Sequence, residues 1–496
     1  MKFLRLWIAV GCLVGAEARS QDIAREASDW KPQIPRVWDD AAIASLELPL
    51  PSLEHTPKHV PSSYFEAIPT RTIWKSYPVY HPDREPEGYW EWLHEQEPQV
   101  AFDPERLKTK ADWIEAGERV FRQGGDYSTG SELRLVRTRE AFETIGIRVT
   151  ADGELPYARY VVREKGIVEL DQSSCASCHM RVLPDGSLLL GGPGDIPLGP
   201  MLAFETRQEL REGIDDVPIT RDDIDYRFAA VPWLTPDPGD FAVGMSGEEL
   251  ARVFDRLPPG VFVRQRTSYL HPVRTPDLIG VGRRRFLDAT GLVHQRSLVD
   301  LMRYAALNEG VDELASYNGF RPAADDGKTL PDPKTWVRSS DAQLYALALY
   351  LDSLQPPPNP NPFDESARRG RILFEREGCG RCHSGLDYSN QKLVPADGFA
   401  PRKEHVERGW VTDVHVGTDP GLTLRTRRGT GYYKIPSLRG VWYRGPFFHD
   451  GSLAALEDVF DPRRLEDDYM PTGFRGPKGG QSKRPRARVR VGSLRE

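Results

Sequence analysis

Two short segments combine thiols and an imidazole at a spacing that can hold a metal or a metal cofactor. Each has the pattern Cys-x-x-Cys-His. The six residues are Cys175, Cys178, His179, Cys379, Cys382 and His383. Apart from Cys12, these pentapeptides contain every cysteine of the 496-residue chain. Four cysteines in two close pairs could form disulfides, bind zinc or act as redox pairs.

The histidine that follows each pair separates these alternatives. Two thiols at this spacing can form thioether bonds to the two vinyl groups of one porphyrin, and the next residue then directs its imidazole at the iron. Zinc or a disulfide leaves both histidines unexplained, and neither segment has the strand-helix-strand surroundings of a thioredoxin-like pair. We therefore predict two covalently attached haem c groups, with His179 and His383 as axial iron ligands.

The elements next to the motifs are predicted to be helical. Residues 364–378 have the apolar spacing of a helix that ends at a glycine directly before the second motif. A Gly-x-x-x-Phe core in this helix recurs within residues 110–124. The matching residues are Gly117 with Gly370 and Phe121 with Phe374. Residues 125–174 separate the earlier helix from its motif and read as an insertion, with a β-hairpin predicted around Lys165 and Gly166.

A second pair of matching segments follows the two motifs. Residues 276–280 and 436–440 share the pattern Pro-x-Leu-x-Gly. Residues 294–298 and 449–453 share the pattern His-x-x-Ser-Leu. The common order of helix, haem motif and these two patterns indicates an internal repeat.

The repeat places one further histidine at an equivalent position in each half. These histidines, His294 and His449, are candidate sixth ligands for the first and the second iron. Met201, His271 or an open coordination position are alternatives for the first iron.

The chain is expected to form a mainly α fold of two cytochrome c-like haem domains, the first with a loop/β-hairpin insertion and an irregular N-terminal arm. An amphipathic helix over 341–354 closes the first domain before a Pro-rich linker. The expected segments are a signal peptide (1–18), an irregular arm (19–105), a first haem domain (106–354) with the insertion 125–174, the linker (355–362), a second cytochrome c domain (363–474) and a basic disordered tail (475–496).

The N-terminus has the order of features of a secretory leader. Lys2 and Arg5 precede an apolar stretch, and the small residues Ala16 and Ala18 follow it. We therefore expect a periplasmic or otherwise exported protein. The formal net charge of -7 is spread over mixed acidic and basic residues, which argues against nucleic-acid partners. No later segment is apolar enough to span a membrane, so no membrane span is expected in the mature chain.

Residues 364–460 resemble the bacterial di-haem cytochrome c peroxidase superfamily, which includes the rubber oxygenases and the di-haem tryptophan-modifying enzymes. Besides the elements above, the segment 445–452, Gly-Pro-Phe-Phe-His-Asp-Gly-Ser, carries the resemblance. In the peroxidases a methionine downstream of this histidine binds the electron-transfer haem, but Arg463 stands at that position here. Met470 could substitute, whereas the rubber-oxygenase branch uses the histidine itself, which favours His449.

Two functions follow from these predictions. If both irons have two protein ligands, the protein transfers single electrons between its haems and to a redox partner protein or a small electron donor or acceptor. If the first iron keeps an open position, the protein is a di-haem peroxidase or oxygenase whose second haem supplies electrons. The open site would then need a polar neighbour, for which Glu169, Gln172, His271 and Arg274 are candidates. The sequence favours electron transfer slightly and leaves catalysis undecided.

Overall fold

The computed structural model describes most of the chain. The described residues are 30–171, 173–213, 229–242, 244–262, 269–310, 313–324, 326–414, 418–466 and 468–475. The expected signal peptide and nearly all of the expected basic tail lie outside them. Within these ranges no helix is both long and apolar enough to cross a bilayer.

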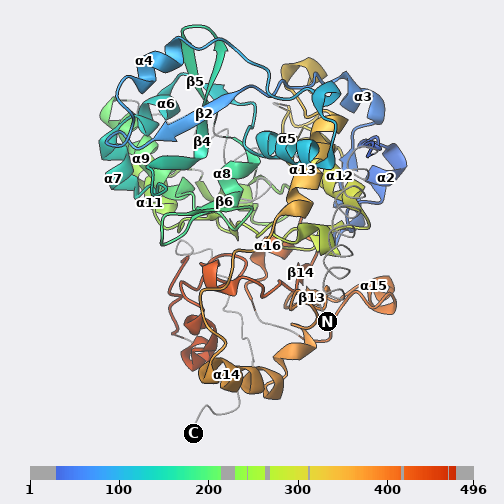
Figure 1. The fold of residues 1–496 in the computed structure, drawn as a ribbon. Helices are drawn as coiled ribbons and strands as arrows, with labels where there is room; N and C mark the ends of the chain where they lie inside the picture. Colours follow the sequence, from blue (N-terminus) through green and yellow to red (C-terminus); the bar gives the residue numbers. More distant parts are fainter. Residues whose placement is uncertain are drawn as a thin grey trace, which may run out of the picture.

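Three helices form the centre of the larger part of the molecule (Figure 1). They are α5 (Lys110–Phe121), α12 (Leu298–Glu309) and α13 (Asp341–Ser353). α5 begins at Thr109, whose hydroxyl accepts the Asp112 amide while the Asp112 carboxylate accepts the Thr109 amide. A side chain on Gly117 would overlap the carbonyl of Ala346 in α13, so glycine allows the two helices to pack closely. The helices predicted over 110–124 and 341–354 are confirmed, but the second is not amphipathic, because the consecutive residues 346–351 are all buried and cover more than a full turn of α13.

A four-stranded sheet lies beside these helices, with strand order β2-β4-β5-β3 and antiparallel neighbours. Its strands are β2 (Ser76–Tyr80), β3 (Tyr127–Ser128), β4 (Glu154–Glu164) and β5 (Ile167–Asp171). β4 and β5 form a hairpin that turns at Lys165 and Gly166, where Gly166 has a φ of 87°. The helices α4 (Tyr89–His94), α6 (Ser131–Val136), α7 (Arg139–Ile145) and α9 (Leu198–Arg211) share a hydrophobic core with this sheet.

Residues 30–105 are tied into the larger part. Val37, Trp38 and Phe65 are buried in the same core as α5 and α13. This segment contains α2 (Asp40–Ala44), β1 (Lys58–His59) and α3 (Ser62–Ala67). Further short elements of the larger part are α8 (Cys175–His179), β6 (Met180–Val182), β7 (Leu188–Leu190), α11 (Gly247–Phe254), β8 (Val261–Phe262), β9 (Val273–Arg274), β10 (Phe286–Leu287), β11 (Val293–His294) and β12 (Ala315–Ser316).

Residues from about 363 onward form the smaller part, drawn in orange and red at the lower side of Figure 1. It contains α14 (Glu365–Arg376), β13 (Leu393–Pro395), α15 (Lys403–Glu407), α16 (Gly421–Leu424) and β14 (Tyr432–Lys434). The buried Arg428 joins the two parts, because its guanidinium donates to the Tyr317 hydroxyl at 2.9 Å and pairs with Glu47 at 3.1 Å. The helix predicted over 364–378 is confirmed by α14.

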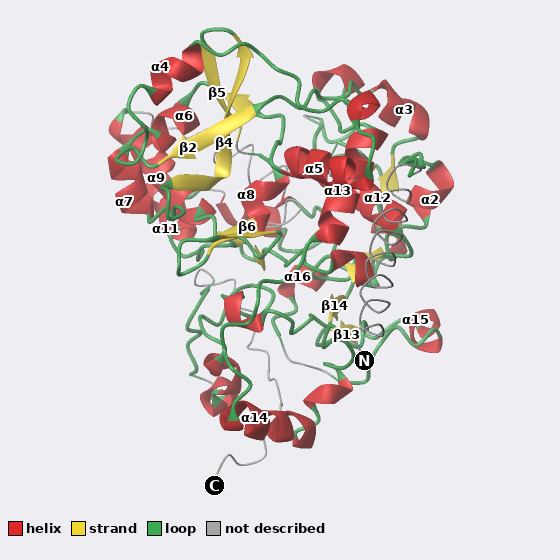
Figure 2. Ribbon diagram, viewed as in Figure 1, coloured by secondary structure: helices red, strands yellow, loops and turns green. Residues whose placement is uncertain are grey.

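The prediction of a mainly α fold of two cytochrome c-like domains was wrong. Helices hold 35% of the residues and strands 14%, and the strands form several small sheets (Figure 2). Many strands are only two or three residues long and pair with distant partners, as β1 does with β12. Such short pairings are set by tertiary contacts and leave no period in the sequence, so the pattern of apolar residues did not indicate them.

Candidate haem-binding site

The first Cys-x-x-Cys-His motif forms the one-turn helix α8. Ser174 caps this helix, since its hydroxyl accepts the Ser177 amide. The Ser177 hydroxyl in turn donates to the carbonyl of Tyr157 in β4 at 2.9 Å, so the sheet positions the motif. Burial raises the pKa of the Cys175 thiol to about 11 and that of Cys178 to about 12. Both thiols are therefore neutral at pH 7.

His179 is held in the orientation that an axial ligand requires. Its Nδ1 lies 3.0 Å from the carbonyl oxygen of Pro276. A carbonyl only accepts hydrogen bonds, so Nδ1 carries the proton and Nε2 keeps its lone pair for a metal. Burial lowers the pKa of His179 to about 4, which keeps the imidazole neutral.

The second motif repeats this arrangement. Residues 379–381 form a short 3₁₀ turn, and His383 Nδ1 lies 3.1 Å from the carbonyl oxygen of Tyr388. His383 also hydrogen-bonds the backbone of Pro436, the counterpart of Pro276, and burial lowers its pKa. The proline of each Pro-x-Leu-x-Gly pattern thus hydrogen-bonds one motif histidine, and His383 has the Tyr388 carbonyl as an additional partner.

The two Pro-x-Leu-x-Gly segments also share a backbone conformation. Gly280 and Gly440 have φ values of 75° and 69°, and each is followed by one turn of 3₁₀ helix. An arginine after that turn folds back onto the segment: Arg284 donates to the carbonyl of Asp277, and Arg444 to the carbonyl of Ser437. The sequence comparison missed these arginines, although both lie four positions after the repeated glycine.

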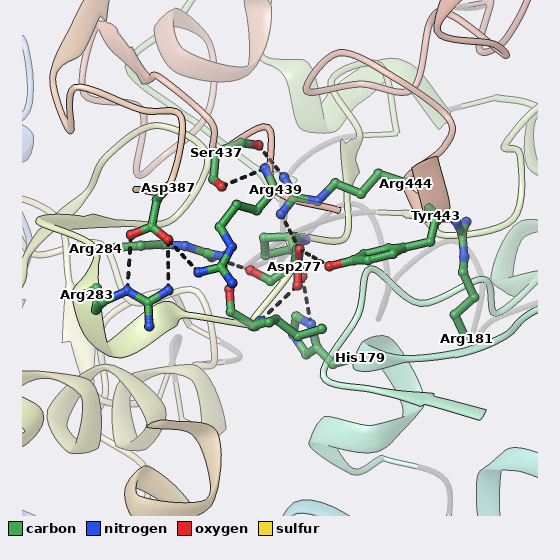
Figure 3. Close-up of polar contacts among 12 residues, drawn as sticks. His179, Arg181, Asp277, Arg283, Arg284, Asp387, Ser437, Arg439, Tyr443 and Arg444 are labelled. Atoms are coloured by element: carbon green, nitrogen blue, oxygen red, sulfur yellow. Dashed lines mark hydrogen bonds and ion pairs between the residues drawn. The ribbon is translucent and has the colours of Figure 1, made fainter. Parts of the chain in front are cut away.

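The two repeats meet at a buried ion pair (Figure 3). The Arg444 guanidinium pairs with the Asp277 carboxylate, which also accepts the Tyr443 hydroxyl at 3.3 Å and the Ile279 amide at 2.9 Å. Nearby, Asp387 pairs with Arg283 at 2.8 Å and with Arg439 at 3.3 Å. Side chains from both halves therefore connect the residues next to His179 with those next to His383.

His449 follows Arg444 by five residues, and both nitrogens of its ring are hydrogen-bonded. Its Nδ1 is 2.9 Å from the Thr418 hydroxyl, and its Nε2 is 3.2 Å from the Tyr433 hydroxyl. His271 is buried nearby, and this burial lowers its pKa to about 4. Coordination of an iron by His449 requires it to exchange one of these hydrogen bonds for the metal.

The structure does not bring His294 together with the first motif. His294 lies in β11, and its ring packs against Trp410 at 4.6 Å and Phe286 at 5.4 Å between ring centroids. In the described part of the chain its ring contacts are with these aromatic side chains, and none is with α8. Its role as sixth ligand stays a prediction that needs a rearrangement of this aromatic cluster.

The candidate polar neighbours of the first iron and the alternative ligand of the second iron lie in different parts of the structure. Glu169 pairs with Arg163 at 2.7 Å on the sheet, and Gln172 lies outside the described residues. Arg274 lines a cavity between the two Pro-x-Leu-x-Gly segments. Met470, the alternative ligand of the second iron, is 55% exposed.

The surroundings of the motifs fit haem. Cys175, Cys178, Cys379 and Cys382 are free thiols. α14, directly before the second motif, has no buried residue among its described side chains. Ile372 in this helix is 64% exposed, and Leu386, just after the motif, is 88% exposed. A haem presents a large apolar macrocycle, and exposed apolar side chains that precede and follow the motif along the chain are suited to pack against it.

Comparisons with known proteins agree with this cofactor. The cytochrome-c peroxidase IdrP1 of Denitromonas iodatirespirans is 29% identical over 153 residues, 25% of this chain and 40% of the relative. Its counterpart from a Pseudomonas species is 30% identical over 25% of this chain and 41% of the relative. The cytochrome c551 peroxidase of Nitrosomonas europaea is 26% identical over 20% of this chain and 28% of the relative. The matched segment spans less than half the length of these curated relatives.

No family model matches the chain. Among solved structures, a hydrazine synthase of Kuenenia stuttgartiensis covers 54% of this chain and 84% of its own, with 17% identity and a TM-score of 0.24, a likeness too weak to support an argument. In part of its length, therefore, the chain resembles cytochrome-c peroxidases, and this resemblance implies haem c as a cofactor.

Proposed function

We propose that the protein is an exported oxidoreductase of the cytochrome-c peroxidase type that carries two covalently attached haems. The proposed attachment residues are Cys175, Cys178, His179, Cys379, Cys382 and His383. The observation that supports this most directly is the matched setting of the two motif histidines. Each is partly buried and hydrogen-bonded to the backbone of an equivalent proline, and His179 is thereby left with Nε2 for a metal.

The two haems are proposed to have different tasks. No described ring contact places His294 near α8, which favours an open position on the first iron. His449 is the proposed sixth ligand of the second iron. When bound, the haems supply reversible one-electron storage and a metal at which peroxide is reduced. Reduction of one hydrogen peroxide to two waters consumes two electrons and two protons, which a redox partner protein or a small donor must deliver.

The residues of this chain orient and connect the haems. The Pro276 carbonyl fixes the His179 tautomer and raises the basicity of its ligating nitrogen. The pair Asp277–Arg444 holds the two Pro-x-Leu-x-Gly segments against each other and so fixes the distance between the motif histidines. A fixed distance is what repeated electron transfer between two cofactors requires.

Electron paramagnetic resonance of the oxidised holo-protein, combined with peroxide turnover, tests this proposal. We expect one high-spin and one low-spin ferric signal in equal amounts, and peroxide-dependent oxidation of a reduced donor. Two low-spin signals without turnover would mean an electron relay. In that case, conversion of one signal to high spin in His294→Ala would identify this histidine as a ligand. Absence of covalent haem in the protein exported with a haem-attachment system would overturn the proposal.

A further inference from the structure

A cavity lies between the two Pro-x-Leu-x-Gly segments and is unusually rich in basic side chains. Both Pro276 and Pro436, the prolines that contact the motif histidines, line it. Its basic lining residues are Arg274, Arg284, Lys392, Lys434 and Arg444. Its acidic lining residues are Asp277 and Asp387. The cavity thus contains a clear excess of positive charge.

The two aspartates of the lining already form ion pairs with other arginines, so the remaining cations of the lining have no carboxylate partner among the lining residues. Asp277 pairs with Arg444, and Asp387 pairs with two arginines outside the lining. Among the residues that the structure describes, Arg284 donates to backbone carbonyls alone, those of Asp277 and Ile279. Nε and Nη1 of Arg274 are buried without a hydrogen-bond partner.

Lys434, like Arg274, is a cation of the cavity lining without a carboxylate partner in the described part of the chain. It has no ion pair in the part of the chain that the structure describes, although its backbone in β14 is hydrogen-bonded to Ala289. Burial and repulsion from Arg284, Arg444 and Arg274 lower the pKa of Lys434 to about 7, although attraction to the nearby Asp288 opposes this shift. Charged groups brought together away from water are unfavourable unless anions compensate them.

We infer that this cavity is a carboxylate-binding site, and that Arg274 and Lys434 bind haem propionates there. The inference rests on the proposed attachment of haem to the two motifs. The prolines that hydrogen-bond the two motif histidines belong to the lining, so the cavity adjoins the residues that would hold each haem. The propionates are anions on the edge of the macrocycle, and guanidinium and ammonium groups pair with such carboxylates strongly.

The inference predicts that these two cations set the reduction potential of at least one haem. Positive charge close to a haem disfavours the ferric state, which carries one more positive charge than the ferrous state. Loss of that charge therefore stabilises the ferric form and lowers the midpoint potential. The variants Arg274→Gln and Lys434→Gln remove the charge and retain a polar side chain.

Spectroelectrochemical titration of the holo-protein tests this prediction. Lys403 and Arg106, whose side chains are 89% and 83% exposed, provide the matched controls Lys403→Gln and Arg106→Gln. We expect a lower midpoint potential for at least one haem in both cavity variants, unchanged potentials in both controls, and an unchanged content of two covalent haems. Unchanged potentials in fully haem-loaded cavity variants would overturn the inference. Lack of covalent haem in the wild type would instead contradict the proposed function.

Two further measurements separate propionates from an exchangeable anion and do not depend on variant folding. Replacement of chloride by acetate or phosphate at constant ionic strength should leave the wild-type potentials unchanged; a dependence on the anion would mean that a free anion fills the cavity. Redox-difference infrared spectra of wild-type protein with ¹³C-labelled haem propionates should show ionised carboxylates at pH 7. Protonated propionates in those spectra would contradict pairing with Arg274 and Lys434.

Discussion

Replacement of Arg444 by methionine should destabilise the protein, because it leaves the buried Asp277 without its ion-pair partner. The two side chains are only 8% and 4% exposed. Removal of one partner from a buried ion pair typically costs about 3–5 kcal/mol. In Arg444→Met, Asp277 keeps the Ile279 amide and the Tyr443 hydroxyl as donors. We therefore expect a loss of about 3 kcal/mol, at the lower end of that range.

Urea unfolding of the holo-protein, followed by tryptophan fluorescence and haem absorbance, measures this loss. The double variant Asp277→Asn/Arg444→Met removes the stranded charge and should recover at least about 1 kcal/mol of the summed single effects. Arg371 forms an exposed pair with Glu375, with side chains 71% and 64% exposed. The control Arg371→Met should therefore change stability by less than about 0.5 kcal/mol. A loss below about 1 kcal/mol in Arg444→Met, or strictly additive single changes, would refute this reasoning.

Three other variants test local features. Burial and nearby acids such as Glu132 raise the pKa of Glu205 to about 7, above its ordinary value of 4.5. The folded state thus binds the Glu205 proton more tightly than the unfolded state does. The stabilisation from this proton is full below pH 4.5 and is lost as the pH rises through 7. Glu205→Gln should therefore be more stable than wild type at pH 8, by about 3 kcal/mol in urea unfolding. Gly117→Val should lower the midpoint of thermal unfolding, followed by circular dichroism, because its side chain overlaps Ala346. Ser174→Ala removes the cap of α8 and should cost about 1 kcal/mol in urea unfolding, with haem still attached.

Local sequence was sufficient to predict the motifs and the helices beside them. Cys-x-x-Cys-His is a contiguous pattern whose chemistry depends on its own spacing. α5 and α14 follow from the spacing of apolar residues and α13 from a continuous apolar segment, all within a few residues along the chain. The two Pro-x-Leu-x-Gly patterns were also visible, because a repeat is a comparison of short strings.

The sequence by itself thus determined which residues can attach haem, whereas only the tertiary structure decided what surrounds them. The contacts of His179 with Pro276 and of Arg444 with Asp277 join residues far apart in the chain. The aromatic setting of His294 and the burial of Arg274 Nε and Nη1 without a hydrogen-bond partner among the described residues likewise depend on segments that meet only after folding. Side-chain burial and partner choice are properties of the whole packed chain, so no local pattern encodes them.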